Sequence, residues 1–216
     1  MFTGIISGLG RITEARPLGA DPSHGKRLVI ETPAGYLDDV QLGDSIAING
    51  ACMTVTSFDA PAARFTLDIS AESLDKTAGL AEPGPVNLEK AMRANDRLGG
   101  HMVSGHVDGL GTVSHFTAVG ESWELRIRTP AELARFIAYK GSITVNGVSL
   151  TVNRVVDASD ASGVDAGGTC ELSINLIPHT LEHTTLGKLQ SGQRVNLEID
   201  LIARYVERML TAPKPT

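Results

Sequence analysis

The sequence predicts an all-β protein in which one small antiparallel domain occurs twice. Four sequence blocks recur in the same order about 100 residues apart, which indicates a duplicated domain. Each copy also contains an Asn-Gly pair between β-prone runs, a strong signal for a hairpin. The 23 glycines and the aromatic content of 4% are typical of many short strands and turns. A chain of 216 residues is long enough for two domains, each with its own core.

The four blocks define the duplication. They pair residues 2–10 with 103–111, 45–55 with 142–152, 73–77 with 180–184, and 86–89 with 195–198. The last block is Val-Asn-Leu-Glu in both copies, and the first shares a Gly, Gly-Leu-Gly frame. Chance does not readily produce four matches in one order. A copy of about 100 residues with short strands and turns fits a small antiparallel barrel or sandwich.

Periodicity and turn residues place the strands. Residues 28–30 and 125–128 are expected as short strands, the second with Leu and Ile on one face and Arg on the other. Asn49-Gly50 and Asn146-Gly147 predict tight hairpins, because both residue types tolerate positive φ.

Short helical segments are expected after two prolines. Thr32-Pro33 and Thr129-Pro130 resemble a helix cap followed by a first-turn proline. The second pair would open a short helix from Ala131 to Tyr139. Residues 157–168, rich in Asp, Ser, Ala and Gly, are an insertion of the second copy that we expect at a hairpin tip, with no function assigned.

The chain is expected to end in a helix over residues 201–210. Ile202, Val206 and Met209 fall on one stripe, and Pro213 stops the pattern. A helix this short is marginal alone, so its apolar face needs a partner. That partner is either the helix's own barrel or another copy of the chain.

Composition excludes several classes of function. The net charge of −6 provides no basic surface for nucleic acid, and no apolar run approaches the roughly 18 to 20 residues that span a bilayer. The first ten residues lack a basic region, so no signal peptide is expected. Cys52 and Cys170 lie far apart without a CxxC motif, which argues against a disulfide scaffold or thiolate zinc site and favours a reducing cytoplasm.

The two copies differ where chemistry would be expected. Cys52 in the first copy corresponds to Ser149 in the second, and each is followed two residues later by a threonine, Thr54 or Thr151. Ile5 corresponds to His106, and Gly43-Asp44 aligns with Lys140-Gly141. Two binding sites of one design with different reactive groups suggest two ligands that are held alike but treated differently.

Each of these residues also has an ordinary structural explanation. Cys52 would then be a small buried hydrophobe, Ser149 and Thr151 would serve strand packing, and Lys140 and His106 would be turn residues. His101 with His106, or His179 with His183, raises the question of a metal. No acidic or thiolate ligand completes either pair at a recognisable spacing, so no metal is expected.

In several blocks taken together the chain resembles the riboflavin synthase family, whose members contain two lumazine-binding repeats. The blocks are residues 1–6, 49–55, 99–109, 139–141, 146–152 and 177–187, which together span nearly the whole chain in order. Met53 stands where the family usually has Leu, and Ser73 where it usually has Thr. Both departures are near-conservative.

The resemblance implies two six-stranded Greek-key barrels, at residues 1–97 and 98–199, and a C-terminal helix at 200–212 that helps to assemble a homotrimer. It implies that two molecules of 6,7-dimethyl-8-ribityllumazine dismutate by four-carbon transfer to riboflavin and 5-amino-6-(D-ribitylamino)uracil, without cofactor or metal. The active sites would lie between subunits, and lumazine synthase is a candidate partner. A non-catalytic lumazine- or flavin-binding protein of the same fold is the alternative.

The resemblance also implies the site residues. The candidate catalytic residues are His106, Cys52, Ser149, Thr151 and Lys140. The substrate contacts carried over from the family are Gly4, Ile5, Ile6, Cys52, Met53, Thr54, Asp68, Ile69, Ser70, Ala71, Glu72, Ser73, Gly105, His106, Val107, Lys140, Ser149, Leu150, Thr151, Ile177, Pro178, His179, Thr180, Leu181 and Glu182.

Overall fold

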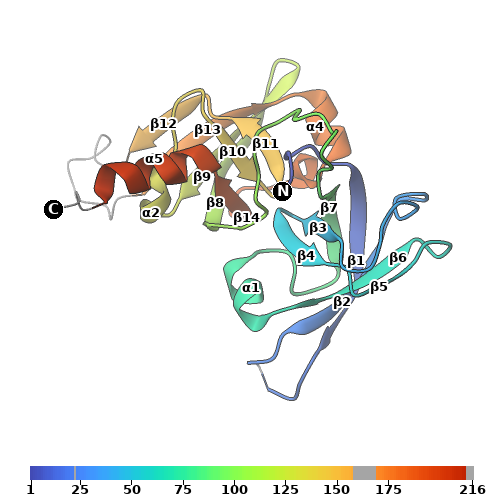
Figure 1. The fold of residues 1–216 in the computed structure, drawn as a ribbon. Helices are drawn as coiled ribbons and strands as arrows, with labels where there is room; N and C mark the ends of the chain where they lie inside the picture. Colours follow the sequence, from blue (N-terminus) through green and yellow to red (C-terminus); the bar gives the residue numbers. More distant parts are fainter. Residues whose placement is uncertain (22, 158–168, 213–216) are drawn as a thin grey trace.

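The structure is a computed structural model that describes residues 1–21, 23–157 and 169–212. It consists of two antiparallel sheets, one for each repeat, with short helices beside them (Figure 1). The all-β class and the duplication are therefore confirmed. Most of the predicted insertion, residues 158–168, lies outside the described residues.

The two sheets have the same strand order. The first runs β4 (Ala51–Thr54), β3 (Ser45–Ile48), β7 (Gly84–Lys90), β1 (Gly8–Pro17), β2 (Lys26–Glu31), β6 (Arg64–Ile69) and β5 (Ser57–Asp59). The second runs β11 (Val148–Thr151), β10 (Ser142–Val145), β14 (Arg194–Ile199), β8 (Gly109–Val119), β9 (Ser122–Thr129), β13 (Cys170–Leu176) and β12 (Arg154–Asp157). Position by position, the second order repeats the first, as a gene duplication requires.

Each sheet has seven strands where six were expected. The additional strand arises because the stretch after each Asn-Gly turn is bent. In the first repeat, β4 pairs with β3, the strand is interrupted at Val55 and Thr56, and β5 then pairs with β6. In the second, Val152 and Asn153 separate β11 from β12 in the same way. One continuous stretch thus joins the two edges of each sheet and curls it into a barrel.

Both predicted Asn-Gly hairpins are confirmed. Asn49 and Gly50 have φ values of 47° and 84°, and Asn146 and Gly147 have 49° and 80°. Positive φ at both central residues is the type I′ turn, which matches the twist of the flanking strands. The two turns also face each other. A Cβ atom at Gly50 would lie 2.8 Å from the backbone N of Gly147.

Four buried asparagines join the repeats around these turns. Asn87 Nδ2 donates to the carbonyl oxygen of Asn146 at 2.9 Å, and Asn196 Nδ2 donates to that of Asn49 at 2.9 Å. Asn87 and Asn196 are each only 1% exposed. Because buried polar groups need partners, this reciprocal pattern explains why the Val-Asn-Leu-Glu block is identical in both copies.

Each barrel has its own apolar core. The first contains Ile12, Leu28, Phe65 and Leu67, and the second contains Leu125, Ile127, Leu172 and Leu197. All of them are at most 1% exposed. Period-2 burial along the strands accounts for this, since alternate side chains of a strand point to one face.

The helices are short, except the last. They are α1 (Ala71–Lys76), α2 (Ala131–Ala134), α4 (Pro178–His183), the 3₁₀ helix η1 (Thr185–Lys188) and α5 (Leu201–Thr211). The helices α1 and α4 occupy equivalent places after β6 and β13. No helix among the described residues is long and apolar enough to cross a membrane.

The expected caps at the Thr-Pro pairs are wrong. The Thr129 hydroxyl donates to the Cys170 carbonyl oxygen at 3.2 Å, and Thr32 bonds likewise to Ala63 at 3.2 Å. Both hydroxyls therefore serve strand ends rather than helices. The helix expected from Ala131 to Tyr139 ends at Ala134, because the following amides form i→i+3 turns instead of continuing the helix.

The C-terminal helix α5 lies outside the second barrel and is confirmed as an amphipathic helix (Figure 1). Ion pairs join Arg204 to Asp108 and Arg135 to Glu207. Its apolar stripe is uncovered, and Met209 is 80% exposed. Docking on its own barrel therefore does not bury this face.

Candidate functional site

The segments that precede the first strand of each repeat are exchanged between the repeats. We call residues 1–7 the first leader and residues 98–108 the second leader. The first leader joins the second barrel, where the Gly4 oxygen accepts a hydrogen bond from Ser149 N at 2.8 Å. The second leader joins the first barrel, where the Gly105 oxygen accepts one from Cys52 N at 2.7 Å. The leaders cross as an antiparallel bridge between Phe2 and Val103.

Two glycines permit this exchange. Gly4 and Gly105 have φ values of 76° and 80°, a region that glycine enters without the steric cost paid by other residues. A Cβ atom on Gly4 would lie 2.6 Å from Ser149 Cβ, and one on Gly105 would lie 2.8 Å from Cys52 Cβ. Each glycine thus lets a leader backbone approach the residue that differs between the copies.

A cavity of about 280 Å³ lies where the second leader crosses the first barrel. We call it the first-repeat pocket, and its lining residues come from β4, α1 and the leader: Ala51, Cys52, Met53, Glu72, Ser73, Lys76, Thr77, Gly105, His106 and Val107. The structure therefore brings together Cys52 and His106, which are 54 positions apart in the sequence. Ala51, Lys76 and Thr77 were not among the candidates, although the matched blocks at residues 45–55 and 73–77 contain them.

The equivalent place in the second barrel, which we call the second-repeat site, is built around Ser149. Ile6 of the first leader, Leu150 of β11 and Leu181 of α4 each pack against the second core. Val107 and Leu74 occupy the matching positions against the first core. The two sites are therefore formed by the same elements, each with the leader of the other repeat.

His101 is a residue of the second-repeat site that the sequence did not single out for it. Its Nδ1 lies 2.7 Å from Ser149 Oγ, and its Nε2 is buried with no hydrogen-bond partner among the described residues. Burial lowers the pKa of His101, and the charge of Asp200 offsets part of this shift. Burial thus favours the neutral imidazole, and the contact places its Nδ1 within hydrogen-bond distance of the Ser149 hydroxyl.

Several candidates of the first repeat lie outside the first-repeat pocket. The Asp68 carboxylate pairs with Arg27 Nε at 2.8 Å, which lowers the pKa of Asp68. Ile69 is in the core at 1% exposure. Ser70 caps α1, where its Oγ accepts from Ser73 N at 3.0 Å. Their roles as substrate contacts remain predictions, as do those of Ala71 and Thr54.

Candidates of the second repeat are mostly exposed. Lys140 has φ of 61° at a turn, and its Nζ donates to Asn153 Oδ1 at 2.8 Å. Thr151 is exposed at the end of β11. The exposed residues around α4 border the second-repeat site: Ile177, Pro178, His179 and Glu182, with Thr180 half-buried.

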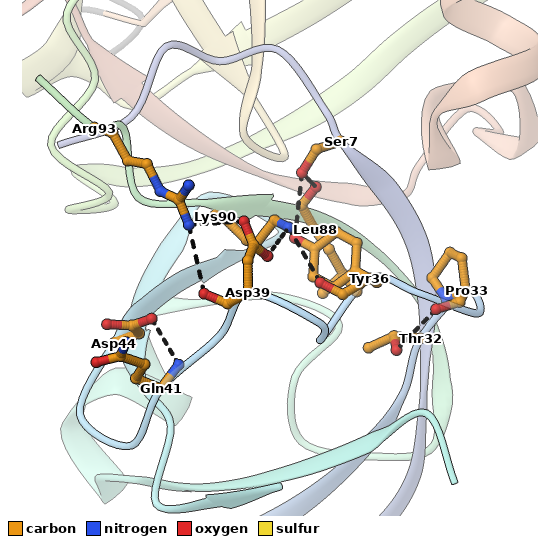
Figure 2. A network of polar contacts seen from close by, with 10 residues as sticks. All are labelled: Ser7, Thr32, Pro33, Tyr36, Asp39, Gln41, Asp44, Leu88, Lys90 and Arg93. Atoms are coloured by element: carbon orange, nitrogen blue, oxygen red, sulfur yellow. Dashed lines mark hydrogen bonds and ion pairs between the residues drawn. The ribbon is translucent and has the colours of Figure 1, made fainter. Parts of the chain in front are cut away.

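A larger cavity, of about 670 Å³, lies elsewhere on the first repeat and includes only Ile5 from the candidate set. Figure 2 shows a network of polar contacts that includes some of its lining residues, among them Ser7, Asp39, Lys90 and Arg93. Asp39 pairs with Lys90 at 2.6 Å and Arg93 at 2.8 Å, and the Lys90 hydrogen bond lowers the pKa of Asp39. Burial raises the pKa of Tyr36 to about 12. The charges of Asp39, Lys90 and Arg93 therefore satisfy one another.

No group of three or more His, Cys, Asp or Glu side chains in the described part of the chain is arranged to hold a metal ion. The stacked rings of His179 and His183 are 4.1 Å apart at their centroids, and His183 Nδ1 lies 2.9 Å from the His179 carbonyl oxygen. That contact keeps one ring nitrogen occupied within the helix.

Comparison with known proteins identifies the repeats. The lumazine binding domain family matches residues 3–91 and 104–200. The chain is 43% identical to the riboflavin synthase of Actinobacillus pleuropneumoniae over 97% of this chain and 90% of that protein. It is 44% identical to the riboflavin synthase of Mycobacterium bovis over 97% of this chain and 98% of that protein.

Solved structures show the same architecture. LumP complexed with 6,7-dimethyl-8-(1'-D-ribityl) lumazine superposes with a TM-score of 0.74 at 26% identity, covering 92% of this chain and 98% of that one. LumP complexed with flavin mononucleotide gives a TM-score of 0.73 at 25% identity, covering 92% of this chain and 99% of that one.

Proposed function

The chain belongs to the riboflavin synthase family of lumazine-binding proteins, and on that premise we propose the reaction that it catalyses. Two molecules of 6,7-dimethyl-8-ribityllumazine react, and one transfers a four-carbon unit to the other. The products are riboflavin and 5-amino-6-(D-ribitylamino)uracil. The chain is accordingly an enzyme of the transferase class.

The observation that supports this proposal is the pair of equivalent sites with unlike reactive groups. A dismutation uses two identical substrates in two different roles. The first-repeat pocket contains Cys52 and His106, whereas the second-repeat site pairs Ser149 with His101 at 2.7 Å. Two sites formed by the same elements suit one kind of molecule, and their different side chains would let the two molecules react differently.

The proposed reaction requires the protein to transfer protons, to stabilise charge on the ring and to orient the two reactants. The acidic ring methyl of the substrate loses a proton, and the charge that develops on the ring must be stabilised. The imidazole of His106 can accept or donate a proton, while Ser149, Thr151 and Cys52 can donate hydrogen bonds or relay protons. Lys140 can stabilise an anionic ring or hold a ribityl hydroxyl. Holding two large planar reactants in register contributes further to the rate.

We propose that the active enzyme is a homotrimer with its active sites between subunits. The first-repeat pocket measures about 280 Å³, below the roughly 300 to 1,000 Å³ usual for sites that enclose a small-molecule ligand. A neighbouring subunit that brings its second-repeat site against this pocket would enclose both substrates. The exposed stripe of α5 supplies an apolar face for the same assembly, with Ile202 at 57% and Val206 at 49% exposure.

Deletion of the chain after Asp200 should reduce the mass in solution from that of a trimer to that of a monomer. The deletion removes the apolar stripe of α5, whose burial we expect to hold the subunits together. Light scattering measures the mass. Arg208→Gln is the control, because it changes an exposed residue of the same helix outside the stripe and should leave the trimer intact. A truncated chain that stays trimeric would refute the role of α5.

The alternative is a carrier that binds a lumazine or flavin without turnover. LumP, which has this fold, is known in complexes with such ligands. The riboflavin synthases are closer in sequence, at 43% and 44% identity against 26%, so the enzyme is favoured.

The purified chain should convert 6,7-dimethyl-8-ribityllumazine to riboflavin with no added cofactor. The two functions make opposite predictions, because a carrier binds the lumazine and leaves it unchanged. The measurement follows flavin absorbance over time and quantifies riboflavin by chromatography. Binding of the lumazine with no riboflavin formed would establish the carrier instead.

Domain bounds and cellular context complete the proposal. We propose bounds of 1–97 and 98–199 for the barrels and 200–212 for the helix, on the strength of the matched strand orders. Cys52 and Cys170 are both free thiols, which suits a reducing cytoplasm. Association with lumazine synthase stays a prediction.

A further inference from the structure

Each barrel buries one carboxylate beneath the leader of its own repeat. Glu89 ends the Val-Asn-Leu-Glu block of β7 and is 6% exposed, and Glu198 ends the same block of β14 and is 2% exposed. Charged residues are seldom buried without a partner. None of the ion pairs among the described residues includes either one.

The partners of Glu198 all belong to the second leader. Its Oε1 accepts from Ser104 N at 2.6 Å and from Ser104 Oγ at 2.7 Å. Its Oε2 accepts from Gly105 N at 3.0 Å and from His106 N at 3.1 Å. Four donors converge on one carboxylate, and the last of them is the backbone amide of a candidate catalytic residue.

Glu89 has the same relation to the first leader. Its Oε1 accepts from Thr3 N and Thr3 Oγ1, each at 2.7 Å, and its Oε2 accepts from Gly4 N at 3.0 Å. Burial raises the pKa of both carboxyls, and the hydrogen bonds from the leaders offset part of that shift. The ionised form is the one that can accept all of these bonds.

The leaders continue from these contacts into the opposite barrel. One residue after Ser104, the Gly105 carbonyl oxygen bonds to Cys52 N at 2.7 Å. One residue after Thr3, the Gly4 carbonyl oxygen bonds to Ser149 N at 2.8 Å. A carboxylate in one barrel therefore fixes the leader that completes the site of the other barrel.

We propose that Glu198 and Glu89 are positioning residues that act crosswise. Glu198, in the second barrel, holds His106 and Gly105 over the first-repeat pocket. Glu89, in the first barrel, holds Gly4 against Ser149. The inference deepens the proposed function, since it assigns to each site a positioning residue that belongs to the other repeat.

Glutamine at these positions would be a specific perturbation. It keeps the size and hydrogen-bonding character of the side chain but replaces one acceptor oxygen with an NH₂ group. At residue 198 this NH₂ must face either Ser104 or the two amides of Gly105 and His106, all of which are donors. Donor facing donor leaves buried N–H groups unsatisfied, so the leader loosens.

The thiol of Cys52 reports on this loosening without any turnover. Cys52 is half-buried under the second leader, whereas Cys170 is 2% exposed in the second barrel. Alkylation of Cys52 by iodoacetamide therefore measures local opening of the leader, and alkylation of Cys170 measures global unfolding. Both rates are followed by mass spectrometry of the full-length chain without substrate.

In Glu198→Gln we expect Cys52 to react about tenfold faster than in the wild type, with Cys170 unchanged, because a charge-assisted network is lost. In Glu89→Gln we expect less than about a threefold change at Cys52, since that network holds the other site. Phe2 of the first leader packs beside Cys52, but its two backbone hydrogen bonds with Val103 keep it in place.

A second matched pair of variants tests the same proposal in case the glutamine variants do not fold. Ser104→Ala removes one donor to Glu198, and Thr3→Ala removes one donor to Glu89. We expect about a threefold faster reaction of Cys52 in the first and less than half that change in the second. Equal Cys52 rates in both members of each pair, whether accelerated or not, would overturn the crosswise assignment. Because no substrate is present, that outcome would leave the proposed reaction standing.

Discussion

Gly50→Ala should lower the free energy of unfolding by about 2 to 5 kcal/mol, combining the cost of positive φ with that of an overpacked interior. The φ of Gly50 is 84°, and a Cβ atom there would lie 2.8 Å from Gly147 N. That contact is with backbone of the other repeat, which cannot rotate away. The two hairpins would have to separate, and the hydrogen bonds of Asn87 and Asn196 across the same interface would lengthen.

Gly43→Ala is the matched control for this prediction. Gly43 has nearly the same φ, 88°, but a Cβ atom there would meet nothing within 4 Å. Its counterpart in the second repeat is Lys140, whose φ is 61°, so this position tolerates a side chain. We expect a loss of only about 1 to 2 kcal/mol for the control. Urea unfolding measures both, and equal losses would show that the repeat interface does not constrain Gly50.

His106→Ala should reduce riboflavin formation by about 10²-fold or more, the range typical of a lost general acid or base. His106 lines the first-repeat pocket together with Cys52. The residue that corresponds to His106 in the first leader is Ile5, which cannot act as an acid or base. Among the described residues, no second imidazole lines that pocket. Initial rates at saturating lumazine measure the effect on kcat.

Two companions make the His106 result specific. Ser149→Ala should also lose turnover, because it removes the hydroxyl next to His101. His24→Ala changes an exposed imidazole in the hairpin between β1 and β2 and should keep the wild-type rate. Light scattering must show the same mass for all three proteins. Wild-type turnover in His106→Ala and Ser149→Ala would remove both residues from the catalytic set.

The sequence predicted the all-β class, the duplication and both Asn-Gly hairpins, but not the seventh strand of each sheet. The recurring blocks and the two Asn-Gly turns predict local structure, and local signals depend only on neighbouring residues. The exchange of leaders could not be predicted in this way. The residues around Gly4 and Gly105 are compatible with a leader that joins its own barrel and with one that joins the other barrel. The two barrels are nearly alike, so the sequence does not distinguish these arrangements.

The candidate site was predictable only where a residue has a counterpart in the other copy. Comparing the copies singled out Cys52, Ser149 and His106, since each differs from its counterpart. It could not single out His101, which precedes Val103, the counterpart of Phe2, and so aligns with nothing in the first copy. The sequence feature next to His101 that relates to the site is Gly100. In the structure, a Cβ atom at Gly100 would lie 2.8 Å from Ser149 Cβ, so only glycine fits there.

The crossed leaders also have a consequence during synthesis on the ribosome. Gly4 of the first leader is translated before both barrels, and Ser149, its partner in the second barrel, follows about 145 residues later. At roughly 5 to 20 residues per second, Gly4 waits about 7 to 30 seconds for this contact. The first-repeat pocket is likewise completed only by Gly105 and His106, which are translated after the strands of the first barrel.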